Sequence, residues 1–203
     1  MGQGVLLALA LLPAAWLAYA ACFGGLGANP VETVTHVSGE WALRLLLASL
    51  AITPLRRLSR WSWLIRYRRT LGLLAFAYVC LHLATFVAFD HFFDWRGIIE
   101  DIAKRPYITA GFAGFVCLVP LAITSTGGWI RRLGRNWQRL HRLAYLAAIC
   151  GVVHYYWLVK ADVTGPGYYA AVLAVLLVIR PLSQRADAFR RRMASAPRRR
   201  GFL

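Results

Sequence analysis

The chain has 203 residues, of which 59% are hydrophobic, and its mean hydropathy is +0.53. This composition is too apolar for an ordinary soluble domain and predicts a protein that crosses a membrane several times. The formal net charge of +16 would also suit a nucleic-acid-binding protein. However, the basic residues alternate with hydrophobic segments instead of forming one stripe, so we expect no nucleic-acid partner.

Six apolar segments follow in chain order, each near the length that crosses about 30 Å of hydrocarbon as a helix. The first resembles a secretory signal but lacks a preceding basic region, so we interpret it as a helix. We therefore expect an all-α, six-helix transmembrane bundle over residues 1–182, followed by a basic, disordered tail over residues 183–203. The segments are Val5–Phe23, Trp41–Leu55, Thr70–Phe89, Tyr107–Ser125, Leu140–Val159 and Tyr168–Leu182.

The distribution of charge predicts the orientation of the bundle. Of the 24 Lys and Arg residues, 19 fall on one side of the predicted membrane, between the second and third segments, before or within the start of the fifth, and at or after the end of the sixth. The other side holds seven of the eight acidic residues. By the positive-inside rule the basic side is cytoplasmic, and both termini lie there.

Two of the segments contain histidines, which are the candidate functional residues. His82 lies in LGLLAFAYVCLHLATFVAF, whereas His141 and His154 lie in RLHRLAYLAAICGVVHYYWLV. An ionisable ring inside a bilayer is costly unless it is paired or coordinated, so it predicts a functional site. Because facing imidazoles hold haem iron in helical bundles, the pattern predicts transmembrane electron transfer through haem, with these histidines as axial ligands.

The depth of each histidine indicates which rings pair. At about 1.5 Å per residue, His82 lies roughly 20 Å beyond Arg69, and His154 lies at a comparable distance beyond Arg139. These two rings are expected to share one haem, whereas His141 lies near the basic interface and would serve a second cofactor. On one straight helix His141 and His154 point about 140° apart, so either the helix is distorted or the two rings address different neighbours.

Each histidine also has a plainer interpretation, as a core residue hydrogen-bonded to another helix. His36, expected in an outer loop, and His91, at the outer end of the third segment, are expected to be solvated, and His91 would help a redox partner to dock. Arg44 lies inside the second segment near the outer face. There it would either pair with a haem propionate or extend its charge to the interface.

Features that the sequence lacks restrict the electron donor. There is no GxGxxG motif, no Walker loop and no soluble stretch long enough for a nucleotide-binding domain. The four cysteines form no CxxC pair, so neither zinc nor an iron–sulfur cluster is predicted. Electrons would therefore come from a separate reductase, a bound flavin or membrane quinol. The clusters RWSWLIRYRR and GGWIRRLGRNW, an interfacial aromatic and basic belt, are also suited to a flavin or quinone entry point.

Three stretches resemble one known family over nearly all of the chain from the second to the sixth segment. They are RRTLGLLAFAYVCLHLATFV, KRPYITAGFAGFVCLVPLAITS and LGRNWQRLHRLAYLAAICGVVHYYW, and the family is the bacterial MsrQ (YedZ) family. Its members are haem-binding membrane subunits of the periplasmic methionine sulfoxide reductase system, and they are similar to the transmembrane domains of ferric reductases and NADPH oxidases.

The resemblance implies a bacterial inner-membrane protein with one or two haem b groups held by His82, His141 and His154. It also implies FMN or a cytosolic flavin reductase, or quinol, as the electron source. The acceptor would be the periplasmic molybdopterin enzyme MsrP, which carries out the sulfoxide reduction itself. Related oxidases use four histidines for two haems, but Arg68 occupies the fourth position here, so the haem number and the partner of His82 stay open.

We therefore predict a six-helix electron carrier that passes electrons outward to a soluble reductase. One rival is a ferric or cupric reductase that acts directly on metal chelates at the outer face and needs no protein partner. The other rival is a transporter or assembly scaffold without a redox cofactor, which predicts no Soret absorption band in the purified protein.

Overall fold

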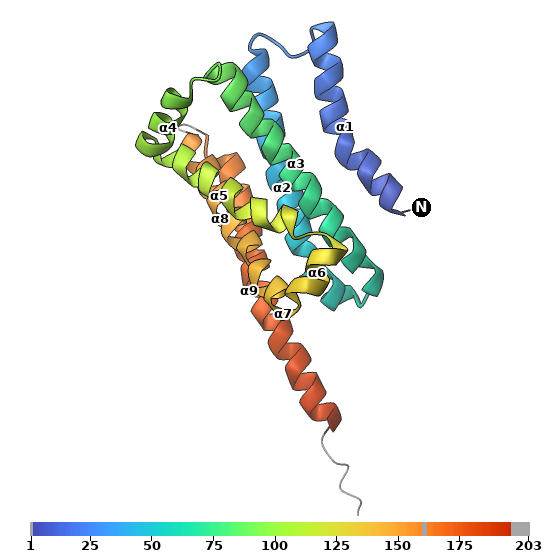
Figure 1. Cartoon of the computed structure of the whole chain (residues 1–203). Helices are drawn as coiled ribbons and strands as arrows, with labels where there is room; N and C mark the ends of the chain where they lie inside the picture. The colour runs from blue at the N-terminus through green and yellow to red at the C-terminus, as the bar shows by residue number, and fades with distance from the viewer. Residues whose placement is uncertain (1, 160–161, 196–203) are drawn as a thin grey trace, which may run out of the picture.

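The computed structural model describes residues 2–159 and 162–195, with side chains described as far as Leu182. All the regular structure in these residues is helical, as predicted, and Figure 1 shows its arrangement. The elements are α1 (Gly2–Phe23), α2 (Pro30–Ser59), a 3-10 turn η1 (Ser62–Leu64), α3 (Ile65–Thr85), a π-helical turn η2 (Phe86–Asp90), α4 (Trp95–Lys104), α5 (Pro106–Ile123), α6 (Gly127–Leu133), α7 (Arg135–Leu140), α8 (Leu143–Leu158) and α9 (Thr164–Ser195).

The predicted count of six crossing helices is not confirmed. Among the described residues, four segments are long and apolar enough to cross a membrane: Gly2–Phe23, Ser62–Asp90, Pro106–Ile123 and Thr164–Leu182. Helix α2 carries Glu40 and Arg44, which lower its hydropathy, and α8 has only 16 residues. Both helices nevertheless contain a predicted segment, so their place in the bilayer stays a prediction.

Helix α2 is twice as long as the predicted segment Trp41–Leu55, because its start is strongly encoded. The Asn29 side chain accepts a hydrogen bond from the Glu32 N–H, and Pro30 occupies the first helical position, two features that favour a helix start. Arg60 ends the helix in the left-handed conformation, at φ 61°. His36, expected in a loop, therefore lies within α2, and that expectation was wrong.

Two helix pairs form the centre of the molecule. Helix α2 packs along α3, and α5 packs along α8, while α9 covers α2 and α8. Ala75, Ala147 and Ala148 are almost completely buried at these contacts, since small residues let helices approach closely. Helix α1 stands apart from the other helices over much of its length (Figure 1).

The predicted fifth segment, Leu140–Val159, forms a continuous helix only from Leu143 onward. Helix α7 ends at Leu140, His141 and Arg142 form a turn, and α8 begins at Leu143. Helix α9 continues to Ser195, so the first part of the segment predicted to be a disordered tail has a helical backbone. Residues 196–203 of that predicted tail lie outside the described residues.

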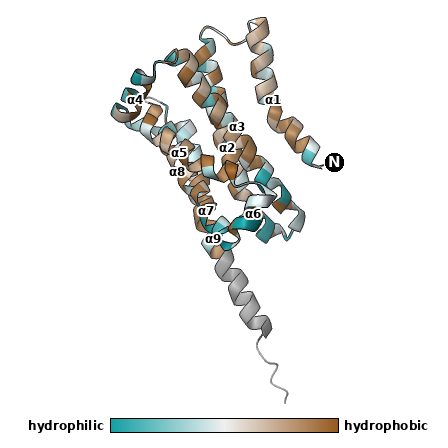
Figure 2. Cartoon of the chain, in the orientation of Figure 1, coloured by the Kyte–Doolittle hydropathy of each residue, from teal (hydrophilic) through white to brown (hydrophobic). Residues whose placement is uncertain are grey.

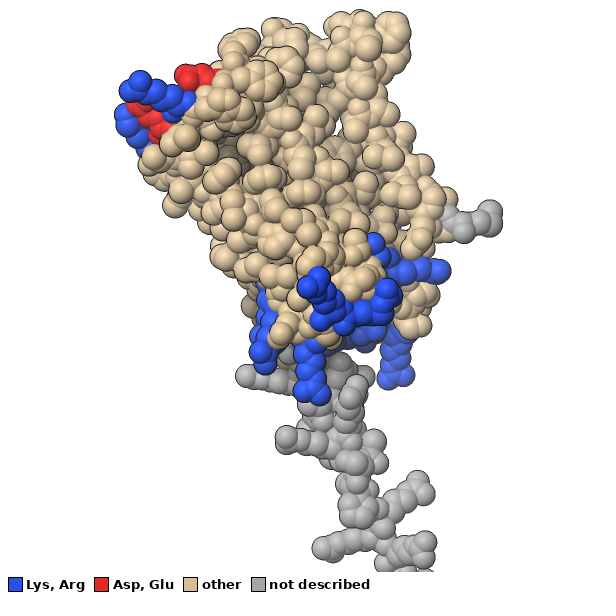
Figure 3. Space-filling view, viewed as in Figure 1, with Lys and Arg blue, Asp and Glu red and all other residues tan. Residues whose placement is uncertain are grey.

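The described charges separate along the molecule as the sequence predicts. Figure 3 shows Lys and Arg side chains gathered at the end that contains α6, while acidic side chains and a few basic ones occupy the opposite corner at α4. The helices between these ends carry mostly hydrophobic residues (Figure 2). We refer below to the basic end and the α4 end of the molecule. The compartment that each end faces stays a prediction.

Candidate functional site

The structure brings two of the three predicted histidines together. His82 on α3 and His154 on α8 have ring centroids 6.0 Å apart, with ring planes at 82°. An imidazole nitrogen lies about 2 Å from a metal that it ligates, so rings on opposite sides of one iron have centroids about 6 Å apart. The two rings thus have the separation of axial ligands to a single iron.

Both rings are oriented by the same kind of hydrogen bond. His82 Nδ1–H donates to the Thr35 carbonyl of α2 at 2.9 Å, and His154 Nδ1–H donates to the Tyr107 carbonyl of α5 at 2.7 Å. A carbonyl only accepts, so these bonds place the ring proton on Nδ1. In the neutral ring Nε2 then keeps its lone pair, as a ligand to a metal requires.

A glycine also allows each ring to approach its neighbouring helix. A Cβ atom at Gly39 would lie 3.1 Å from His82 Nδ1, and a Cβ atom at Gly111 would lie 2.8 Å from His154 Nδ1. Each glycine lies one turn after the residue that supplies the carbonyl. Any side chain at Gly111 would overlap the His154 ring, and a side chain at Gly39 would crowd the His82 ring.

These contacts reveal a similarity between two halves of the chain that sequence reasoning missed. In each half the histidine lies 47 residues after the residue whose carbonyl it contacts. The run LAIT also occurs in each half, once in α2 and once at the end of α5. This short repeat and the matching spacing of glycine and histidine were the available signals. The candidate site therefore has two similar halves, one from α2 and α3 and one from α5 and α8.

The two histidines line a cavity of about 640 Å³, a volume in the usual range for cofactor sites. Its walls are mainly apolar and come from α2, α3, α5 and α8. The apolar residues include Leu43, Leu46, Val79, Phe115 and Leu118. The cavity continues toward α4, where Asp101 and Ile102 also line it, so this helix covers one side of its opening.

Polar residues lie at the opening of the cavity. From the sequence they were predicted to lie elsewhere or had no predicted role in the site. Arg105 lines the cavity and forms an ion pair with Asp101 at 3.1 Å. His91 also lines it and lies 3.3 Å from the other oxygen of Asp101. His36 is a third lining residue. His36 and His91 are therefore not simply solvated. Arg105 is a further cation at the opening that could pair with a carboxylate of a bound cofactor, a role that sequence reasoning missed.

Arg44 does not line this cavity. Its Nε donates to the Tyr169 hydroxyl at 2.8 Å, it forms an ion pair with Glu40, and it lies over the Trp41 ring at 5.1 Å from the centroid. Glu40 does line the cavity and is also 3.4 Å from the Tyr155 hydroxyl. Arg44 thus neutralises the Glu40 carboxylate at the cavity. Arg105, which lines the cavity, is better placed than Arg44 to pair with a haem propionate.

His141 is kept away from the other two histidines. It lies in the turn between α7 and α8, stacked on the Trp137 ring at 3.9 Å between centroids, and its Nε2 is 3.2 Å from the Thr124 hydroxyl. That hydroxyl donates its own proton to the Pro120 carbonyl at 2.6 Å, so Nε2 must be the donor in the bond to Thr124.

The Nε2 atom of His141 is therefore hydrogen-bonded, whereas no described residue bonds to Nε2 of His82 or of His154. The 140° rotation between His141 and His154 left two possibilities, a distorted helix or rings that address different neighbours. The structure shows that the two rings address different neighbours. The residues present fit a bis-imidazole haem in the main cavity, since they supply two neutral rings, apolar walls and a cation at the opening.

Comparisons with known proteins show which proteins the chain is similar to. A family model described as "Ferric reductase like transmembrane component" matches residues 38–152. The chain is similar to proteins named "Protein-methionine-sulfoxide reductase heme-binding subunit MsrQ". The relative from Herminiimonas arsenicoxydans is 52% identical over 88% of this chain and 83% of its own length. The one from Caulobacter vibrioides is 53% identical over 87% and 84%, and the one from Rhodospirillum rubrum is 50% identical over 89% and 87%.

Proposed function

Because the chain belongs to the MsrQ family, within the ferric reductase-like transmembrane proteins, we propose that it binds haem b and carries electrons across the bacterial inner membrane. The acceptor is the periplasmic molybdopterin enzyme MsrP, which repairs oxidised methionine in proteins. The observation that carries the proposal is the pair of rings, His82 and His154, 6.0 Å apart in one cavity.

In this proposal each residue of the site has a separate task. The haem would supply one-electron chemistry, and His82 and His154 would hold its iron through Nε2. The Thr35 and Tyr107 carbonyls keep the Nδ1 protons in place, which orients the rings and raises their basicity. The apolar walls would exclude water from the iron, and Arg105 would pair with a propionate at the opening. The structure supports one bis-histidine haem, since His141 lies elsewhere.

The electron donor would act at the basic end. Basic side chains gather there (Figure 3), and the Arg180 guanidinium lies over the Tyr145 ring, 4.4 Å from its centroid. The stacked rings of His141 and Trp137 lie a few residues before Tyr145 in the chain. Such a concentration of cations suits the phosphate of FMN, supplied to the protein directly or by a cytosolic flavin reductase. Quinol is the alternative donor. In both cases His141 belongs to the entry side for electrons and not to the haem.

The orientation of electron transfer is a testable consequence of the charge distribution. If the basic end is cytoplasmic, a flavin reductase added to inside-out vesicles should reduce the haem, whereas the same enzyme added to right-side-out vesicles should leave it oxidised. The rate of haem reduction, followed by the absorption change of the haem, measures this difference. Equal rates in the two preparations would contradict the proposed topology.

The spectrum of the purified protein tests the proposal itself. We expect a Soret band and, after dithionite reduction, the bands of a low-spin b-type haem. We also expect the electron paramagnetic resonance signal of the ferric haem to be highly anisotropic, because the ring planes are nearly perpendicular, at 82°. Absence of haem would support the transporter or scaffold rival, and a signal typical of parallel rings would contradict the observed ring geometry.

A ferric or cupric reductase remains the second candidate, because the matching family model carries that description. The mixed charges at the α4 end, including the Glu100–Lys104 and Asp101–Arg105 pairs, favour a protein partner, since redox encounters are often steered by charge. Reoxidation of the reduced haem by MsrP, compared with reoxidation by ferric chelates, distinguishes the two functions.

A further inference from the structure

A tyrosine of α3 binds the backbone of helix α1 near the middle of that helix. The Tyr78 hydroxyl of α3 donates to the Ala10 carbonyl at 2.8 Å and accepts from the Ala14 N–H at 3.1 Å. In an uninterrupted helix these two backbone groups would bond to each other. Pro13 lies next to this point, and an inserted side chain or a proline opens a helix locally. The hydroxyl therefore fixes α1 to α3 at this level.

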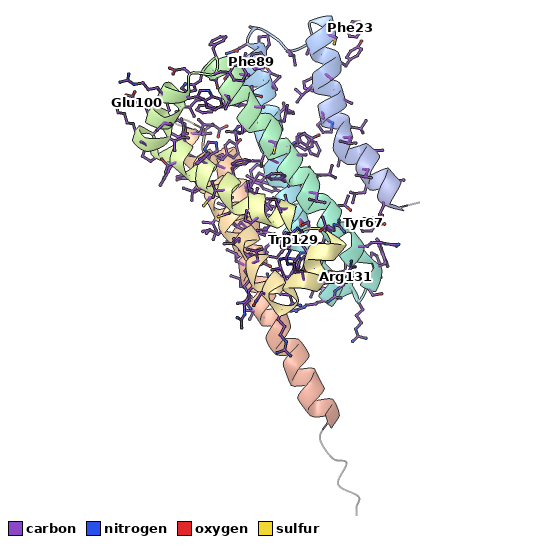
Figure 4. The ribbon with its side chains drawn as sticks, in the orientation of Figure 1. Phe23, Tyr67, Phe89, Glu100, Trp129 and Arg131 are labelled. Atoms are coloured by element: carbon purple, nitrogen blue, oxygen red, sulfur yellow. The ribbon has the colours of Figure 1, made fainter. Side chains whose placement is uncertain are left out.

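A second contact joins the two helices at the basic end. Gly2, at the start of α1, lies so close to the Tyr67 hydroxyl of α3 that a side chain at Gly2 would collide with it. Figure 4 shows Tyr67 at the same end of the molecule as Trp129 and Arg131, and Phe23 and Phe89 toward the opposite end. The two helices thus meet at two levels.

Between these two contacts the helices enclose a crevice of about 470 Å³. Leu7 of α1 and Leu73 and Leu74 of α3 form an apolar part, whereas Arg66 and Arg69 lie toward the basic end. The crevice therefore has the profile of a phospholipid, with an apolar region at the depth of acyl chains and positive charge at the depth of the headgroup.

The two arginines are available to an anion. No acidic side chain in the described part of the chain forms an ion pair with either of them, since the described acids lie toward the α4 end. The Arg66 guanidinium lies over the Trp63 and Tyr67 rings, at 5.8 Å and 5.4 Å from their centroids. These rings hold one cation at the edge of the crevice without neutralising it.

We propose that an anionic phospholipid occupies this crevice, with its phosphate between Arg66 and Arg69 and an acyl chain along Leu7, Leu73 and Leu74. A quinol fits the apolar part but has no charge for the two arginines. A free phosphate fits the arginines but leaves the apolar part exposed. The lipid satisfies both parts and completes the contact between α1 and the bundle. This inference does not depend on haem binding.

Native mass spectrometry of the full chain with added phosphatidylglycerol tests the site. We expect the double variant Arg66→Gln/Arg69→Gln to bind the lipid roughly thirtyfold more weakly, because each basic residue near the membrane surface contributes about fivefold. The matched control is Arg131→Gln/Arg132→Gln, which removes the same charge from the same end but lies outside the crevice. An equal loss in the two variants would mean general charge attraction and would overturn the proposal.

A third variant tests the apolar part and does not depend on how well the arginine variant folds. Leu7→Trp fills the crevice from α1, so it should displace phosphatidylglycerol although both arginines remain. Phosphatidylcholine should bind the wild-type protein much more weakly. Glycerol phosphate should not compete at concentrations where the lipid saturates. Full competition by glycerol phosphate, or displacement of the lipid by ubiquinone at equal concentration, would contradict a phospholipid as the occupant.

Discussion

Replacement of His82 with alanine should abolish the low-spin haem spectrum almost completely. His82 and His154 form the single pair of neighbouring histidine rings among the described residues, and low-spin haem needs two strong axial ligands. Removing one ring leaves the iron with a single protein ligand and leaves space where the ring was. We therefore expect either loss of haem or a high-spin spectrum, measured on purified protein before and after dithionite reduction.

The matched control for this variant is His141→Ala. The structure places His141 against Trp137 and Thr124 and away from the cavity, so this variant should keep the full haem content and the low-spin spectrum. His154→Ala should behave like His82→Ala. If His141→Ala lost the haem and His154→Ala kept it, the pairing of His82 with His154 would be wrong.

This pairing was accessible from the sequence because helices have a constant rise. Counting residues from Arg69 and Arg139 placed His82 and His154 at the same depth, and the structure confirms that their rings lie together. Basic residues mark the ends of these membrane segments, so the depth of each histidine could be counted from them. Depth along a helix is thus readable from a single sequence when charged residues mark its ends.

Rotation about the helix axis was much harder to predict. It depends on how neighbouring helices pack, and the hydropathy of one segment carries little information about that. The turn at His141 and Arg142 removed the constraint that His141 and His154 share one helix. Gly39 and Gly111 were overlooked for the same reason, since their importance comes from rings on other helices.

The error over His36 had a different cause. Asn29, Pro30 and Glu32 carry a strong signal for a helix start, but the first part of α2 is polar, so its hydropathy does not mark it as a membrane segment. Helix α2 therefore reaches the opening of the cavity with His36 and Glu40, which both line it. In membrane proteins the polar ends of helices need the same attention to capping as helices in soluble domains.

Replacement of Gly111 with alanine should weaken haem binding strongly, although glycine 111 itself would never touch the iron. The new methyl group would lie 2.8 Å from His154 Nδ1 and 3.1 Å from its Cγ and Cε1, so the ring must move or turn. Overpacking of this kind costs about 1–3 kcal/mol, which corresponds to a loss in haem affinity between about fivefold and about 140-fold. Haem content after purification and titration of haem into the apoprotein measure the effect.

Gly39→Ala is the equivalent variant in the other half of the site. The two variants together test whether the glycines position both histidine rings. The methyl group at Gly39 would lie 3.1 Å from His82 Nδ1, a milder contact, so we expect haem to remain while the anisotropy of its paramagnetic resonance signal changes as the His82 ring turns. Gly167→Ala is the control, because a Cβ atom there meets nothing within 4 Å, and it should leave haem binding and the signal unchanged. Unaltered spectra in both Gly111→Ala and Gly39→Ala would show that the glycines do not position the rings, while leaving haem ligation by His82 and His154 to be judged from the histidine variants.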